Sequence, residues 1–368
     1  MIGLIMCTRE CNLRCRYCFE EENFKSVVLP SRNKINKNFE EAMPIIKSFC
    51  KQLVDYNKIH NNRNTFTFHG GEPLLIYPHL IDEMCEYIYN IAGKTRFNVQ
   101  TNGTLLDDNM IQVLKKWDFQ VGISIDGCKD THDENRVDCA ECGTHEQVLR
   151  GIQKLRKAGI SFGTMATITR SISKNPEAFY HFYADNDLNV GFNACYTSPQ
   201  SCNQGNRLDD KEYSEFLIRL FDLWSNDTKH NISIRPFERI IKNMTKPCGS
   251  MEVCTYVEDC RQVNIAVDIS GNIYQCLHYC NLPNGEIGDL KKESLEAIIT
   301  RESGKPNRWE TLKKGKCGKC DIFNYCYGGC PYYHDAESLT GLDHDFNCAS
   351  QKVIVHYIYD QIKRIQKI

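Results

Sequence analysis

Short apolar runs alternate with longer amphipathic stretches through the first half of this 368-residue chain, and this alternation constrains its fold most strongly. The apolar runs predict strands, and stretches with apolar residues three or four positions apart predict helices. Strands are expected at 3–8, 65–69, 97–100, 121–125, 160–168 and 190–195. Helices are expected at 38–57, 79–92, 107–116, 145–157 and 176–186. Strands linked through helices form parallel sheets, so six such repeats predict an α/β fold that is a partial or complete barrel.

The chain beyond this alternation has a different texture. Residues 198–247 form a connector with one strong predicted helix at 211–224, and a last helix is expected at 349–365. From residue 248 onward the predicted strands are short, turns are frequent and cysteines are dense. We therefore predict three parts: a barrel at 1–200, a helical connector at 201–247, and a cysteine-rich domain at 248–368.

Composition limits the compartment and the partners. The 21 cysteines would indicate disulfides in a short secreted protein, but the N-terminus lacks the basic lead and cleavage site of a signal peptide. Metal or cluster ligation in a reducing cytoplasm is therefore favoured. No apolar run is long enough to span a bilayer. The formal net charge of −2 lacks the excess of basic residues that nucleic-acid-binding proteins usually carry. We expect a cytoplasmic protein with neither a membrane nor a nucleic-acid partner.

Three cysteines stand directly after the first predicted strand, where the sequence reads Cys-x3-Cys-x2-Cys. Cys11, Cys15 and Cys18 can hold three irons of a [4Fe–4S] cluster and leave the fourth iron open to a small molecule. Sites in βα barrels lie at the C-terminal ends of the strands, which is where this triad falls. The spacing therefore indicates a reactive cluster site rather than a site that only stabilises the fold.

Polar residues also follow the next three strands. The strand ends read His69-Gly70-Gly71-Glu72-Pro73, Gln100-Thr101-Asn102-Gly103 and Ser124-Ile125-Asp126-Gly127, and Arg136 follows in the next loop. Each segment alone also fits an ordinary tight turn. Together with the triad, they indicate one site at the mouth of the sheet.

The triad, with Tyr17 before its last cysteine, and the later Gly-Gly-Glu-Pro segment resemble the signature of the radical S-adenosylmethionine (radical SAM) superfamily over residues 1–200. The resemblance implies a partial (β/α)6 TIM-like barrel and an oxidoreductase whose 5′-deoxyadenosyl radical abstracts a substrate hydrogen. It implies that the triad holds a [4Fe–4S] cluster and that S-adenosylmethionine chelates the open iron. An electron donor such as flavodoxin or ferredoxin is also implied. The expected cofactor-binding residues are Tyr17, Gly70, Gly71, Glu72, Gln100, Asn102, Ser124 and Arg136.

A second set of cysteines occupies the C-terminal part. Seven cysteines follow a regular spacing from Cys260 to Cys348, which exceeds what one tetrahedral metal needs and fits two clusters better. Cys317 and Cys320 alone also fit a zinc ribbon. Two further cysteines, Cys50 and Cys85, lie on apolar helix faces and are expected in the core. The sequence assigns no role to Cys139, Cys142, Cys195, Cys202, Cys248 and Cys280.

The spacing of this second set resembles the SPASM extension found in radical SAM enzymes that modify peptides and proteins. Cys254 resembles a further ligand of anaerobic sulfatase-maturating enzymes. The resemblance implies two fully ligated auxiliary [4Fe–4S] clusters, and so three clusters in all. One would use Cys254, Cys260, Cys276 and Cys330, and the other Cys317, Cys320, Cys326 and Cys348.

One departure from the sulfatase-maturating pattern bears on function. Those enzymes carry an aspartate base directly after the cysteine at the Cys276 position, whereas this chain has Leu277, which cannot accept a proton. The adjacent His278 is the candidate catalytic base, although a lone histidine also fits a structural role. We therefore predict modification of a peptide or protein substrate, through a thioether or other side-chain cross-link in a ribosomally made peptide.

Two alternatives stay open. The first is an anaerobic sulfatase maturase that oxidises Cys or Ser to formylglycine, as Cys254 and Gln100-Thr101-Asn102-Gly103 suggest. The predicted first strand begins at the N-terminus, so no recognition domain is expected ahead of it, which also favours this alternative. The second, from another class, is a non-catalytic iron–sulfur electron carrier.

Overall fold

A computed structural model describes residues 1–18, 29–195, 206, 208–245, 257, 259–333 and 348–366. The chain divides into two compact units, each made of several segments. The first comprises Met1–Ile125, Asp133–Gly163 and Arg261–Lys305, and the second comprises Asp126–His132, Thr164–Cys260 and Pro306–Ile368. The predicted domains 1–200, 201–247 and 248–368 stay a prediction.

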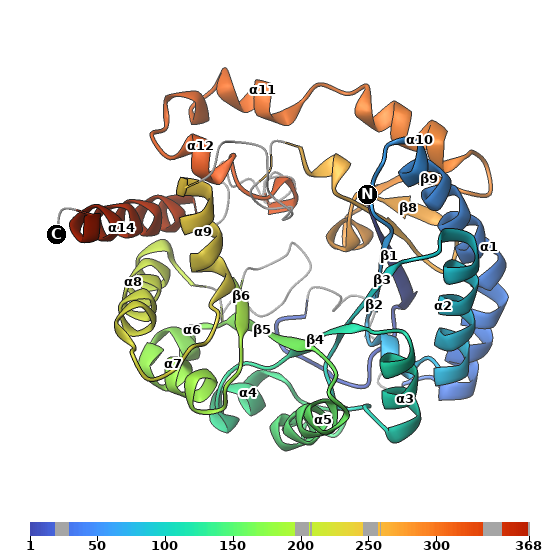
Figure 1. The fold of residues 1–368 in the computed structure, drawn as a ribbon, viewed down its shortest axis with the longest axis horizontal. Coiled ribbons are helices and arrows are strands. Elements are labelled where there is room, and N and C mark those ends of the chain that lie inside the picture. Colours follow the sequence, from blue (N-terminus) through green and yellow to red (C-terminus); the bar gives the residue numbers. More distant parts are fainter. Residues whose placement is uncertain are drawn as a thin grey trace. The chain divides into compact units, whose positions relative to one another are not determined.

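The first unit is built on a parallel sheet whose helices α1, α2 and α3 lie side by side along the strands (Figure 1). Its elements are β1 (Ile2–Thr8), α1 (Arg32–Ile59), β2 (Thr65–Gly70), η2 (Pro73–Leu75), α2 (Pro78–Ala92), β3 (Arg96–Thr101), α3 (Asp108–Lys116), β4 (Gln120–Ser124), α5 (His145–Ala158), β7 (Asn264–Val267), β8 (Asn272–Tyr274), η6 (Leu277–Asn281), β9 (Glu286–Asp289) and α10 (Leu295–Ser303).

Register brings the C-terminal ends of the first four strands to one edge of the sheet. Thr8 of β1 pairs with Gly70 of β2 after a local register shift, and Thr101 of β3 pairs with Ile123 of β4. On the other side of β1, strand β7 pairs with it in parallel, and β8 and β9 follow as antiparallel strands. The loops after β1, β2 and β3 therefore begin close to one another.

Alternation along the strands builds the core of this unit. Phe66 and Phe68 of β2 are fully buried, as are Phe49 and Leu53 on the apolar face of α1. Gly3 permits this close packing, because a Cβ there would lie 2.7 Å from a Leu53 methyl carbon. Burying four such side chains contributes on the order of 2 kcal/mol each.

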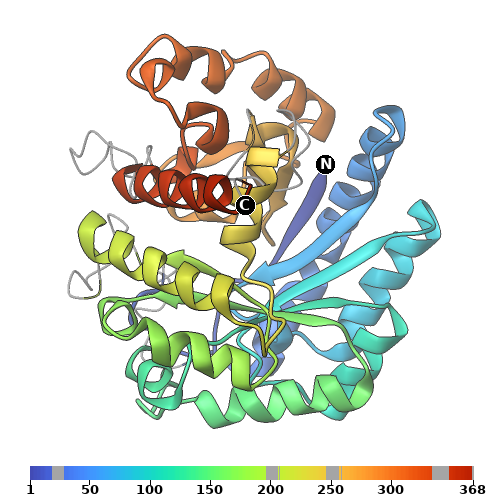
Figure 2. The ribbon, with the colours of Figure 1, turned by 60° about the vertical axis from the view of Figure 1, so that its left-hand side comes forward.

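The second unit is mostly helical around the parallel pair β5–β6. Its elements, three of which begin or end in the first unit, are α4 (Lys129–Asn135), β5 (Phe162–Ile168), α6 (Arg170–Ser173), α7 (Pro176–Asp185), β6 (Val190–Ala194), α8 (Asp210–Asn226), α9 (Arg235–Thr245), η5 (Cys260–Gln262), α11 (Arg308–Lys313), η7 (Cys317–Lys319), α12 (Phe323–Cys326) and α14 (Cys348–Gln366). The last helix, α14, packs along α8 (Figure 2).

All six predicted strands and the predicted helices are present, and the α/β class is confirmed. The largest boundary error is at α1, which begins at Arg32 because Ser31 caps it by accepting a hydrogen bond from the Lys34 amide. Helix α9 and the pairing of β7 with β1 were not predicted. None of the helices in the described ranges has the length and apolar character needed to cross a bilayer.

Candidate active site

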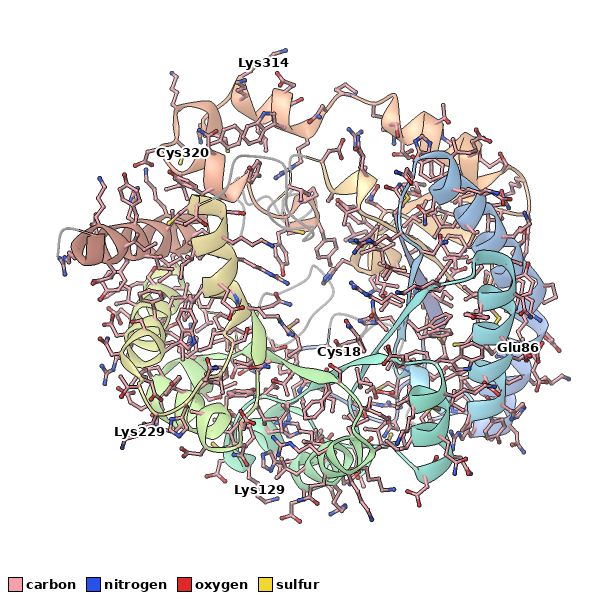
Figure 3. All side chains as sticks on the ribbon, in the orientation of Figure 1. Cys18, Glu86, Lys129, Lys229, Lys314 and Cys320 are labelled. Atoms are coloured by element: carbon pink, nitrogen blue, oxygen red, sulfur yellow. The ribbon has the colours of Figure 1, made fainter. Side chains whose placement is uncertain are left out.

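The loop that follows β1 carries the three predicted cluster ligands. Cys11 is buried, and Cys15 and Cys18 are half-buried (Cys18 is labelled in Figure 3). The backbone fixes this loop: the Arg14 amide donates to the Val137 carbonyl at 2.7 Å, and the Arg16 amide donates to the Asn135 carbonyl at 2.9 Å. Backbone hydrogen bonds to residues 135 and 137 therefore hold this loop in place.

The pKa of Cys11 reflects its burial and its neighbours. Burial raises the pKa of Cys11 well above its ordinary value, and the negative charges of Glu72, Cys15 and Cys18 raise it further. A thiol in such surroundings ionises only when a cation replaces its proton, as iron does on binding. Three converging thiols on a rigid loop fit a cluster that takes one thiolate on each of three irons.

Gly70 and Gly71 bring the end of β2 against this loop. The Gly71 amide donates to the Thr8 carbonyl and the Glu72 amide donates to the Glu10 carbonyl, both at 2.8 Å. A Cβ on Gly71 would lie 2.2 Å from the Glu10 carbonyl oxygen, so no other residue fits there. We expected these glycines to let the backbone approach a ligand; in the structure they let two backbone segments approach each other.

Glu72 uses its carboxylate inside the protein. The side chain is 1% exposed and accepts hydrogen bonds from the Leu74 amide, the Thr101 hydroxyl and the Asn102 amide, at 2.7 to 2.9 Å. Burial raises the pKa of Glu72 to about 7, and these three hydrogen bonds oppose that rise. Its carboxylate thus ties the turn after β2 to the end of β3, and its expected contact with the cofactor stays a prediction.

Asn102 links the end of β3 to the cysteine loop. Its side-chain amide points at the Cys11 sulfur at 3.8 Å and donates to Asn12 Oδ1 at 2.9 Å. Its Oδ1 accepts from the Thr104 amide and hydroxyl, at 3.0 and 2.7 Å. Asn102 therefore contacts a predicted ligand directly and orients it.

The remaining expected cofactor residues form two pairs. Gln100 Nε2 donates to Ser124 Oγ at 3.2 Å, which joins the ends of β3 and β4. The Arg136 guanidinium lies over the Tyr17 ring at 5.4 Å from its centre, and the Arg136 side chain is largely buried. The structure thus brings these residues together as expected, while their contacts with a cofactor stay predictions.

The segment after β8 carries Cys276, Leu277 and His278. Leu277 is 6% exposed and packs in a hydrophobic cluster with Met6, Ala266 and Tyr274. Burial and, to a smaller extent, the neighbouring His69 lower the pKa of His278 to about 4. His278 is therefore neutral at pH 7 and a weaker base than an ordinary histidine.

Four predicted ligands of one auxiliary cluster lie together in the second unit. Burial, together with the nearby charges of Cys320, Cys348 and Cys317, raises the pKa of Cys326 to about 12. Cys320, labelled in Figure 3, closes a turn by donating its amide to the Cys317 carbonyl at 2.9 Å. This grouping fits the predicted set.

The other auxiliary set stays a prediction. Cys254 lies outside the described residues, and Cys260, Cys276 and Cys330 are divided between the two units. Across the described ranges, no group of three or more His, Cys, Asp or Glu side chains is arranged around a single metal ion. A cubane takes one thiolate per iron, so its ligands surround a cluster rather than one ion.

Comparison with known proteins identifies the family. Residues 5–182 match the model of the Radical SAM superfamily. This part of the chain is a radical SAM domain. The protein is a radical SAM enzyme, which argues against a non-catalytic electron carrier.

Its relatives include sulfatase-maturating enzymes. The chain is 27% identical to the cysteine-type anaerobic sulfatase-maturating enzyme of Clostridium perfringens, over 96% of this chain and 94% of the relative. It is 25% identical to the serine-type enzyme of Bacteroides thetaiotaomicron, over 91% of this chain and 84% of the relative. The fold is similar to a solved structure described as native anSMEcpe with bound AdoMet and Cp18Cys peptide (TM-score 0.78, 24% identity, 99% of this chain and 98% of that one).

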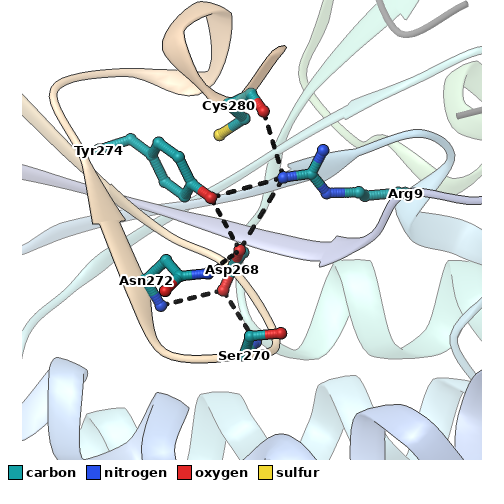
Figure 4. Close-up of polar contacts among 6 residues, drawn as sticks. All are labelled: Arg9, Asp268, Ser270, Asn272, Tyr274 and Cys280. Atoms are coloured by element: carbon teal, nitrogen blue, oxygen red, sulfur yellow. Dashed lines mark hydrogen bonds and ion pairs between the residues drawn. The ribbon is translucent and has the colours of Figure 1, made fainter. Parts of the chain in front are cut away.

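Sequence reasoning missed one residue of this radical SAM domain, Arg9. Its guanidinium donates to the Cys280 carbonyl at 3.2 Å and the Tyr274 hydroxyl at 3.5 Å, and lies 3.9 Å from Asp268 Oδ2 (Figure 4). Asp268 is 4% exposed and accepts from the Ser270 and Asn272 amides. Arg9 thus links the loop of Cys11 to the segment that follows Cys276. No sequence pattern indicated this network, because its residues are far apart along the chain.

Proposed function

We propose that this radical SAM enzyme modifies a side chain of a peptide or protein substrate, forming a thioether or another cross-link in a ribosomally made peptide. The observation that carries this proposal is Leu277. It stands where sulfatase-maturating enzymes carry a catalytic base, and it packs in the hydrophobic cluster with 6% of its surface exposed. A reaction that needs no base at that position fits this residue best.

The chain's own residues hold the reacting groups in this proposal. Cys11, Cys15 and Cys18 ligate the first cluster, and the auxiliary sets named above ligate two more. The methionine part of S-adenosylmethionine is positioned by Gly70, Gly71 and Glu72. Arg136 and Tyr17 line one side of the cofactor site. When bound, these groups supply a radical that can abstract hydrogen from an unactivated carbon. A small electron-transfer protein such as flavodoxin or ferredoxin delivers the electron.

Formylglycine formation on a substrate Cys or Ser is the second candidate. It is favoured by the 27% identity to a cysteine-type sulfatase-maturating enzyme over nearly the whole chain. His278 would then take the proton from the substrate, although burial lowers its pKa to about 4. A base with so low a pKa accepts a thiol proton with difficulty at pH 7.

Mass spectrometry of the product separates the two candidates. The anaerobically reconstituted enzyme is reduced with dithionite and given two probes, a Cys-containing sulfatase peptide and the Cys-rich peptide encoded nearest its gene. A cross-linked product keeps its sulfur and loses two hydrogens, whereas formylglycine made from Cys loses the sulfur. A cross-linked product from the Cys-rich peptide supports the proposal. Loss of sulfur from the sulfatase peptide overturns it.

The control variant is Cys15→Ala, which should form no 5′-deoxyadenosine above background. If Cys15→Ala cleaves the cofactor like the unchanged enzyme, the assignment of the triad fails as well.

A further inference from the structure

Two cysteines outside every predicted cluster set share a short hairpin of the first unit. Cys139 and Cys142 belong to the sequence Cys-Ala-Glu-Cys, and both are exposed free thiols. Neither proposed function uses them. Cys50 and Cys85, by contrast, are fully buried, and burial raises the pKa of both thiols.

Hydrogen bonds hold the two cysteines close together. The Asp138 amide donates to the Cys142 carbonyl, and the Cys142 amide donates to Asp138 Oδ1, both at 2.9 Å. The Glu141 amide closes a turn on the Asp138 carbonyl, and Glu141 has a φ of +59°. This is a three-residue hairpin loop with a left-handed last residue.

Such a loop leaves the two cysteines within bonding reach. Cys139 is the first residue of the three-residue loop, and Cys142 directly follows the loop. A disulfide bridges Cα atoms roughly 4.4 to 6.8 Å apart, a separation that a turn of this length allows. Both side chains are exposed.

The hairpin also contacts the loop of the first predicted cluster. Asp138 forms a bridge with Leu13, and Cys139 Sγ lies 3.7 Å from the Asn12 carbonyl, to which it donates. The Arg16 guanidinium pairs with Glu141 at 3.2 Å. The pair therefore lies on a hairpin that contacts the residues around Cys11.

We propose that Cys139 and Cys142 form a reversible dithiol–disulfide site, oxidised by low-molecular-weight disulfides and separate from the cluster ligands. One thiolate attacks the small disulfide, forms a mixed disulfide and releases one thiol. The second cysteine then attacks the mixed disulfide, forms the intramolecular bond and releases a second thiol. Two electrons and two protons pass from the pair to the oxidant, so the exchange balances.

Exposure supports this assignment. Exposed disulfides are the labile and regulatory ones, whereas buried thiols are inaccessible to the attacking sulfur. The proposal needs neither candidate reaction, because it concerns thiols that no cluster set includes.

The test equilibrates the reconstituted holoenzyme, without oxygen, in mixtures of reduced and oxidised glutathione. Remaining thiols are alkylated and each cysteine is quantified by peptide mass spectrometry. Cys139 and Cys142 should lose alkylation together and gain an intramolecular disulfide, with a tenfold change in the dithiol-to-disulfide ratio for about every 30 mV, as a two-electron couple requires. Cys50 and Cys85 should form neither a disulfide nor a glutathione mixed disulfide, and they serve as internal references.

Two serine variants keep the proposal falsifiable. Cys142→Ser should trap Cys139 as a stable glutathione mixed disulfide, because the resolving thiol is gone. The double variant Cys139→Ser/Cys142→Ser should retain the iron content and the 5′-deoxyadenosine formation of the unchanged enzyme. The proposal is overturned if the pair stays as two thiols in oxidised glutathione, if the unchanged enzyme accumulates mixed disulfide instead, or if the double variant loses iron.

Discussion

The two cysteine regions of this radical SAM enzyme are held in place by different means. The N-terminal loop that carries Cys11 is tied by backbone hydrogen bonds to two neighbouring segments, the turn after β2 and residues 135–137. The C-terminal segment of Cys317, Cys320 and Cys326 is held by short turns and by stacking of Trp309 on Phe323, with ring centres 4.1 Å apart.

Arg308 supplies most of the polar support in the C-terminal segment. Its guanidinium donates to three successive carbonyls, those of Tyr327, Gly328 and Gly329, at 2.6 to 3.3 Å. All three residues have a positive φ, which glycine adopts readily but which is costly for Tyr327. Contacts from two neighbouring segments thus hold the N-terminal loop, whereas short turns, ring stacking and Arg308 hold the C-terminal segment.

The largest predicted difference follows from removing one cysteine in each region. Cys15→Ala should reduce 5′-deoxyadenosine formation to background, while the free energy of unfolding of the iron-free chain changes by less than about 1 kcal/mol, because the backbone holds the loop. Cys320→Ala should retain cofactor cleavage within about tenfold, because it leaves the first cluster site intact. In both variants, chromatography measures the 5′-deoxyadenosine formed and urea unfolding measures the free energy of unfolding. Equal loss of cleavage in the two variants would break the comparison.

The second prediction tests the protein contacts around the N-terminal loop. Glu72→Ala should lower the free energy of unfolding by about 3 kcal/mol, since it leaves three buried donors without their charged acceptor. Glu83→Ala is the matched control, because it removes a half-exposed ion pair with Lys47 and should cost less than about 1 kcal/mol. Urea unfolding of the iron-free proteins measures both. Equal effects would mean that the Glu72 contacts do not hold the site.

A third prediction sharpens the comparison in the C-terminal region. Arg308→Met should weaken the turn at Gly328 by about 2 kcal/mol, which corresponds to roughly thirtyfold faster exchange of the Gly329 amide. That amide donates to the Cys326 carbonyl at 3.0 Å, so it reports directly on the turn. Arg301→Met, which removes an exposed pair with Glu293, is the control. Unchanged exchange at Gly329 would show that the turn does not need Arg308.

The smallest effect concerns pH, at a carboxylate in neither cysteine region. Hydrogen bonds from Tyr180, His230 and the Lys229 amide hold the pKa of Asp227 below its usual value. The unfolded chain therefore takes up the proton first as pH falls, so the stability that Asp227 gives is lost below about pH 4. Asp227→Asn should flatten the acid side of the stability curve. A curve as steep as that of the unchanged protein would contradict this.

Local patterns predicted most of the first half correctly. Helical periodicity and capping residues placed α2, α3, α5 and α7 within one residue at each end, because these signals lie within the elements themselves. The pairing of β7 with β1 could not be predicted in this way. It joins residues more than 250 positions apart, and only packing decides such a contact.

The candidate site shows the same division. The strand-end rule correctly placed Gln100 beside Ser124, while the cluster site of the triad stays a prediction. The role of Glu72 could not be predicted, because its three partners lie on two different loops. Nor could the burial of Leu277, since a leucine after a cysteine fits a core or an exposed cleft equally well.

The arginine that precedes the triad has a practical consequence for engineering. Arg9 reaches from the loop of Cys11 to the Cys280 carbonyl and towards Asp268, so the segments 9–18 and 268–280 carry complementary halves of one network (Figure 4). A chimera that exchanges either segment alone would leave the buried carboxylate of Asp268 or the guanidinium of Arg9 without its partner. Grafting from a relative should therefore move both segments together, as one inseparable cassette.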